Sequence, residues 1–200
     1  MENEKAINIR YRDFSKGIDI LQTILIYISA LLVPVFLGKV LNEVFGSTSV
    51  VATNSQLIVG SIVNALLVMT ALNLKGTLKI AGVVTMPSIA TILSGYIFHT
   101  ASVFMVYMIP AIWLGNFALI YTLKKLFVVK KTNYFLTSLI GIILKVAIIF
   151  GAFSMLRIIG IFPEKLIANL QKAMGITQII TATIGVLLAY ILCILGRKNN

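Results

Sequence analysis

The sequence has 200 residues, of which 59% are hydrophobic and 12% are charged, and its mean hydropathy is +1.01. Soluble domains carry about 25% charged residues, so this composition excludes a soluble globular domain and indicates an integral membrane protein. The formal net charge of +11 comes from cations between the apolar runs, which argues against a nucleic-acid-binding surface.

Six apolar runs follow one another along the chain. A membrane-spanning helix needs about 20 residues, and six such helices with short connections use almost the whole length. We therefore predict an all-α integral membrane protein with six transmembrane helices in one domain, 18–195, between tails at 1–17 and 196–200. The expected helices cover residues 18–41, 57–72, 80–93, 102–123, 134–156 and 176–195.

Two features complicate this simple pattern. The second and third runs are short, and Pro87 interrupts the third, so these two helices are open to a tilted or partly re-entrant arrangement. Between the fifth and sixth runs, the segment from Pro163 to Gly175 has proline at its start, apolar residues on one side and glycine at its end. This pattern predicts a short amphipathic helix.

The lysines and arginines predict the orientation. Twelve of them lie in the N-terminal tail, the link after the second run, the loop after the fourth run and the C-terminal tail. The segment between the fifth and sixth runs carries only Arg157, Lys165 and Lys172. Because cytoplasmic loops are enriched in lysine and arginine, both termini are expected in the cytoplasm.

One lysine lies inside an apolar run. Lys145 is the only charged residue between Lys131 and Arg157, and a lysine at the centre of a membrane helix costs about 2.5–3.5 kcal/mol on insertion scales. Asn64 and Asn116 fall at a similar depth in two other runs. Two interpretations stay open: a structural polar cluster that fixes helix packing, or a ligand cavity in which Lys145 faces an anionic or carbonyl group.

Two further residues join this candidate site. Gln178 lies near the outer end of the last run and is placed to reach an outward-facing pocket, although a glutamine there often caps a helix or faces the interface. Trp113 lies one turn from Asn116 on the same helix face, where it is a pocket wall or a packing residue. The candidate substrate-binding residues are Asn64, Trp113, Asn116, Lys145 and Gln178.

Missing motifs argue against several functions. The sequence contains no GxxxxGK[ST] loop, no HExxH motif and no carboxylate in the middle of an apolar run. His99 is the only histidine, and one histidine makes no metal site. We therefore expect neither an enzyme nor a resident metal or cofactor, and no carboxylate-based proton or sodium coupling.

Three short stretches resemble a known family. They are Gly60-Ser61-Ile62-Val63-Asn64-Ala65, the stretch Ile109-Pro110 through Leu114-Gly115-Asn116, and the mid-helix Lys145. Together with six helices and cytoplasmic termini, they resemble a poorly characterised branch of the substrate-binding S components of energy-coupling factor (ECF) transporters. The resemblance covers about residues 57–195.

The sequence departs from the family pattern at two places. Ser61 stands where a proline is expected after the glycine, and Ala30 is followed four residues later by Pro34 instead of a second alanine. Docking residues are therefore not assigned. The chain also lacks the N-terminal histidine of nickel and cobalt members, which disfavours a divalent metal as substrate.

The resemblance implies a mechanism and a location. An S component in a prokaryotic plasma membrane captures a micronutrient, such as a vitamin, from outside and docks to a transmembrane T component that carries two ATPases. Asn64, Asn116 and Lys145 would line the pocket floor, and the first outer loop with the His99 tip would form a lid. The alternatives are a stand-alone small carrier or channel, and a non-transporting membrane scaffold or assembly protein. The substrate, the oligomeric state and the docking faces are left open.

Overall fold

The computed structural model describes residues 16–46, 48–73, 77–98 and 101–198. Several predicted features fall outside these described residues: most of the N-terminal tail, Lys75 in the link after the second run, His99, and the last two residues. Within the described part of the chain, all regular secondary structure is helical, with no strand. The prediction of an all-α protein is therefore confirmed for the described residues.

The helices follow the predicted runs closely, with short helical turns added between them. Five of the described segments are long and apolar enough to cross a membrane, and Ile80–Ser94 is a shorter apolar helix, so the protein has five or six candidate spans. In chain order the elements are α1 (Lys16–Phe45), α2 (Val50–Thr53), α3 (Ser55–Asn73), α4 (Thr77–Ser94), α5 (Ser102–Met105), η2 (Val106–Met108), α6 (Ile109–Thr122), η3 (Leu123–Val129), α7 (Tyr134–Ile158), α8 (Glu164–Met174) and α9 (Ile176–Lys198).

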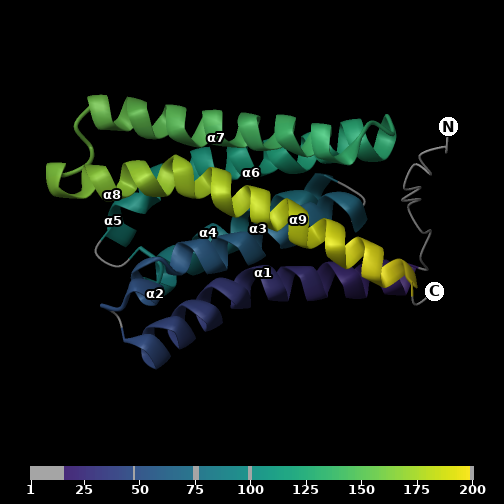
Figure 1. Ribbon diagram of the computed structural model, residues 1–200, viewed down its shortest axis with the longest axis horizontal. Coiled ribbons are helices and arrows are strands. Elements are labelled where there is room, and N and C mark those ends of the chain that lie inside the picture. Colours follow the sequence, from purple (N-terminus) through teal and green to yellow (C-terminus); the bar gives the residue numbers. More distant parts are fainter. Residues whose placement is uncertain (1–15, 47, 74–76, 99–100, 199–200) are drawn as a thin grey trace.

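The long helices lie side by side in one bundle (Figure 1). α3 packs along α9, α6 packs along α7, and α1 rests against α3 and α4. Glycines allow these close approaches, as small residues do in membrane bundles. A Cβ at Gly185 in α9 would come within 2.8 Å of the backbone of α3, and one at Gly115 in α6 within 3.0 Å of the Lys145 carbonyl oxygen.

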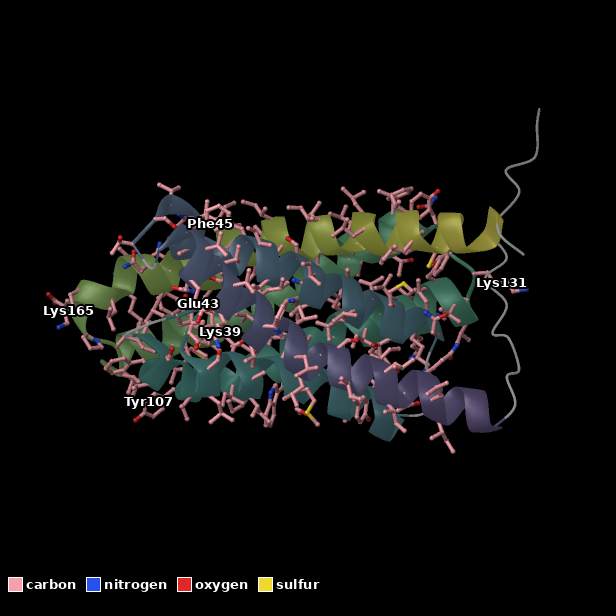
Figure 2. The ribbon with its side chains drawn as sticks, turned by 90° about the horizontal axis from the view of Figure 1, so that it is seen from below. Lys39, Glu43, Phe45, Tyr107, Lys131 and Lys165 are labelled. Atoms are coloured by element: carbon pink, nitrogen blue, oxygen red, sulfur yellow. The ribbon has the colours of Figure 1, made fainter. Side chains whose placement is uncertain are left out.

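The two ends of the bundle differ in charge. α1 begins and α9 ends at the same end of the bundle, where the turn between η3 and α7 also carries Lys130 and Lys131; we call this the basic end (Figure 1). α8 lies at the opposite end, which we call the α8 end. Figure 2 shows Lys131 at the basic end and Lys39, Glu43 and Lys165 toward the α8 end.

The segment expected as one helix over 102–123 has an irregular start. It runs through α5 and the 3₁₀ turn η2 before α6 begins, and Pro110 lies in the first turn of α6. Proline has no N–H to donate and its ring crowds the carbonyl four residues earlier, which accounts for the irregular turn just before it. Pro34 and Pro87, by contrast, lie inside α1 and α4 without ending them.

The predicted amphipathic helix is confirmed as α8. Pro163 precedes its first residue and Gly175 follows its last. Leu170 and Met174 are buried, whereas Lys165 and Lys172 on the other side are exposed. α8 packs against both α7 and α9, so it covers the C-terminal part of α7 and the start of α9.

The apolar core is continuous in one half of the bundle and divided in the other. The half toward the basic end is filled by one large cluster that includes Leu67, Leu119 and Val186. Toward the α8 end there are two smaller clusters. One joins Met105, Ile149 and Phe153 with α8, and the other joins Leu41, Val59 and Ile97.

Candidate functional site

A cavity of about 90 Å³ lies among α3, α4, α6, α7 and α9, in the half of the bundle toward the α8 end. Residues of both smaller apolar clusters line it, and Phe98 packs against the two clusters as well. Four of the five predicted site residues are in its wall. The described residues that line it are Gln56, Val59, Gly60, Val63, Asn64, Pro87, Ser88, Thr91, Ile92, Ile97, Phe98, Met105, Ile112, Asn116, Lys145, Gln178 and Thr181.

Lys145 lies halfway along α7 and is only 2% exposed. Its Nζ donates a hydrogen bond of 2.5 Å to Oδ1 of Asn64 on α3. An ammonium group has three donors, so this contact leaves two for other acceptors. None of the described residues in the wall is a carboxylate, and the described salt bridge of the chain joins Lys39 to Glu43, on the surface of α1.

Asn64 is held in place by the rest of its side chain. Its Nδ2 donates to the Gly60 carbonyl oxygen at 2.8 Å and to Oγ1 of Thr181 on α9 at 3.2 Å. These two bonds use both amide hydrogens, which orients Oδ1 toward Lys145. Asn64 therefore positions the lysine and ties α3, α7 and α9 together at the floor of the cavity.

Two polar atoms of the wall have no hydrogen-bond partner in the described part of the chain. They are Oδ1 of Asn116 on α6 and Oγ of Ser88 on α4, in residues that are 4% and 8% exposed. A buried polar atom without a partner costs about 1–3 kcal/mol. Because both residues line the cavity, a small rotation of either side chain would bring its oxygen to a bound molecule or water that supplies the missing partner.

Gln178 and Gln56 close the cavity toward α8. Both side-chain amides donate to the same acceptor, the carbonyl oxygen of Ala173 in α8, each at 3.2 Å. Gln178 lies in the first turn of α9 and Gln56 in the first turn of α3. Two cavity residues therefore connect α8 to the helices that carry Asn64 and Thr181.

Trp113 is placed elsewhere. It packs against the large cluster toward the basic end and does not line the cavity, and its buried Nε1 has no partner among the described residues. Trp113 and Asn116 share a side of α6, but the indole extends into the core while Asn116 faces the cavity. The three-residue spacing along the helix could not predict that Trp113 and Asn116 have different surroundings.

Several wall residues were not singled out from the sequence. Ser88, Thr91 and Phe98 come from the α4 side of the cavity, and Gln56 was placed in a loop. One usable signal was present: Ser88 follows Pro87 inside an apolar helix, where a polar residue needs a partner. In the described residues, no group of three His, Cys, Asp or Glu side chains forms a metal-binding arrangement.

Comparison of the chain with protein-family models, curated proteins and solved structures finds no match.

Proposed function

We propose that this protein is a substrate-capture subunit of an importer in a prokaryotic cell membrane, and that it binds a small molecule in the cavity around Lys145. The observation that carries the proposal is a buried ammonium group with unused donors beside two unpartnered polar atoms, Asn116 Oδ1 and Ser88 Oγ. A lysine at this depth normally faces a protein interior or a wet cavity and has a partner. An anionic or carbonyl-bearing substrate would complete its hydrogen bonds.

The charge distribution supports an outward-facing cavity. Lys124, Lys125, Lys130 and Lys131 cluster toward the basic end, and the positive-inside rule assigns that end to the cytoplasm. With six crossings, both termini are cytoplasmic. The cavity then lies in the outer half of the membrane, with the α4–α5 connection at Ile97 and Phe98 over its α4 side.

The proposed partners follow from the resemblance to ECF S components. The chain carries no nucleotide-binding loop, so ATP-driven import requires other subunits. In this proposal a transmembrane T component with two ATPases docks to the loaded protein, and ATP turnover drives release of the substrate into the cytoplasm. The apolar residues exposed along α1, such as Ile24, Leu25 and Leu32, are in contact with lipid or with such a partner.

A second candidate function is a non-transporting scaffold. The observation in its favour is the internal hydrogen-bond network, since Asn64 already gives Lys145 one acceptor and links three helices. The cavity volume of about 90 Å³ is also small beside the roughly 300–1,000 Å³ of typical ligand pockets. In this case Lys145 acts only in helix packing.

Native mass spectrometry of gently purified protein separates the two candidates. We expect the wild type to retain a small molecule, which extraction then identifies, and the Lys145→Met variant to fold normally but to lose that molecule. Methionine fills a similar volume without a charge, so the change tests the ammonium group and not the packing. A wild type and a variant that are equally stable and equally empty would contradict the capture function and support the scaffold.

A stand-alone carrier is tested with the same preparation. Purified protein in vesicles without ATPases is expected to bind its substrate but not to move it across the membrane. Transport under these conditions would contradict the subunit proposal in favour of an independent carrier or channel.

A further inference from the structure

We propose that the substrate is a compact monocarboxylic acid with a second hydrogen-bonding group and an otherwise apolar body, bound with its carboxylate on Lys145. This inference rests on the proposed capture function and names the substrate class of the same cavity. It follows from three properties of the wall: its charge, its unused donors and acceptors, and its apolar area.

The charge of the wall selects a single negative charge. Among the described residues that line the cavity, Lys145 is the only ionisable one. A buried charge is costly unless it is paired. A monoanion cancels the wall charge, whereas a dianion leaves one buried negative charge and a cation places two positive charges together. The wall therefore discriminates against cations and dianions by charge alone.

The free donors of Lys145 select a carboxylate. Asn64 accepts one of the three ammonium hydrogens and has both of its own hydrogens committed to Gly60 and Thr181. Asn64 consequently has no hydrogen to offer a substrate and acts as a positioning residue. The two remaining ammonium donors match an acceptor that has two oxygens and a negative charge.

The opposite side of the cavity selects a second hydrogen-bonding group on the substrate. The side-chain amide of Asn116 both donates and accepts, and no hydrogen bond joins it to another described residue. Ser88 Oγ lies on the α4 side, and its hydroxyl also either donates or accepts. A substrate that reaches from Lys145 to Asn116 therefore carries a hydrogen-bonding group away from its carboxylate.

Apart from Gln56, Thr91 and Gln178, the remainder of the described wall is apolar. It includes Ile92, Phe98, Met105 and Ile112, which surround the path between the polar floor and the α4–α5 connection. Such side chains favour an aliphatic or aromatic body over a sugar or a polyol, whose hydroxyl groups would lose their hydrogen bonds to water. The small volume of about 90 Å³ favours a compact molecule.

The test offers the purified full-length protein two pools of small molecules extracted from cells. One pool is untreated, and in the other the carboxylates have been converted to methylamides. Native mass spectrometry and extraction identify what the protein retains. We expect a monocarboxylic acid from the untreated pool and loss of that compound from the amidated pool.

Two variants then locate the carboxylate and the second hydrogen-bonding group. Lys145→Gln keeps a donor for Asn64 but removes the charge, so it is expected to weaken binding of the retained acid by about tenfold or more. Asn116→Leu leaves Lys145 and Asn64 unchanged. It is expected to weaken the same acid by about tenfold while its preference over the methylamide persists.

The outcomes distinguish this inference from the proposed function. A neutral or cationic compound retained equally from both pools, or a dianion retained from the untreated pool, would overturn the inference and leave the capture function standing. A folded protein that retains nothing from either pool would overturn both. An acid whose preference over its methylamide survives in Lys145→Gln would place the carboxylate elsewhere and overturn the assignment to Lys145.

Discussion

The two halves of the bundle use the same helices for different purposes. Toward the basic end, α3, α6, α7 and α9 close around one apolar cluster, and Tyr134 donates a hydrogen bond of 2.9 Å to the Val186 carbonyl oxygen. Toward the α8 end, these helices leave a cavity whose wall holds a buried cation and unpartnered polar atoms. One half therefore holds the helices together, and the other is available for a ligand.

This difference follows from the residue types at matching depths. In the basic half, the rings of Phe127, Tyr134 and Tyr190 pack edge-on or tilted with centroids 5.1–5.3 Å apart and fill the space between η3, α7 and α9. In the other half, asparagine, serine and threonine face one another, and short side chains do not fill the same volume. The unfilled volume is the cavity. Its polar atoms are either hydrogen-bonded to each other or without a partner in the described part of the chain.

The largest expected effect on stability comes from Asn64→Leu at the boundary of the two halves. Leucine has a similar volume but gives Lys145 no acceptor, so the free energy of unfolding should fall by about 3 kcal/mol. Unfolding of the purified protein by titration with sodium dodecyl sulfate measures this change. The double variant Asn64→Leu/Lys145→Met should recover most of the loss, and a double variant as unstable as the single one would show that Lys145 is not the cause.

A smaller loss is expected when α3 and α9 are pushed apart. Gly185→Ala adds a Cβ that would lie 2.8 Å from the Ala65 backbone nitrogen, which should cost about 1–3 kcal/mol. Gly151→Ala on the exposed side of α7 is the matched control, because a Cβ there meets nothing within 4 Å. Equal stability of the two variants, measured by the same titration, would contradict the close contact of α3 with α9.

The smallest expected effect on stability comes from a change confined to the basic half. Tyr134→Phe removes the hydroxyl that donates to Val186 and should lower the free energy of unfolding by about 1 kcal/mol. Since Tyr134 lies outside the cavity wall, binding of the retained small molecule should be unchanged. Loss of binding in this variant would show that the two halves are not independent.

The sequence predicted the helices better than the interior. Long apolar runs and the stop signals around Pro163 and Gly175 are local properties, so the helix ranges and α8 were accessible without a structure. The depth of Lys145, Asn64 and Asn116 followed from counting residues along each run, and the structure brings all three to one cavity. Depth depends only on the position of a residue along its helix, so it can be predicted without knowing how the helix is rotated.

Rotation and packing were not accessible in the same way. Trp113 lies one turn from Asn116, yet it is half-buried against the large apolar cluster and does not line the cavity. The link from Gln56 and Gln178 to the Ala173 carbonyl oxygen depends on how α8 folds back over α3 and α9, which no spacing in the sequence encodes. In each case, contacts between helices determine where the side chain lies.

The central claim, that the cavity opens to the outside, is tested most directly by cysteine accessibility in intact cells. Thr91→Cys places a thiol of similar size on the cavity wall, and Thr70→Cys places one in the buried core of the basic half. Both are made with Cys193→Ala, which removes the single native cysteine. A membrane-impermeant methanethiosulfonate added from outside should modify the Thr91→Cys thiol and spare the Thr70→Cys thiol. Modification of the Thr91→Cys thiol only from the cytoplasmic side, in inverted vesicles, would contradict the account.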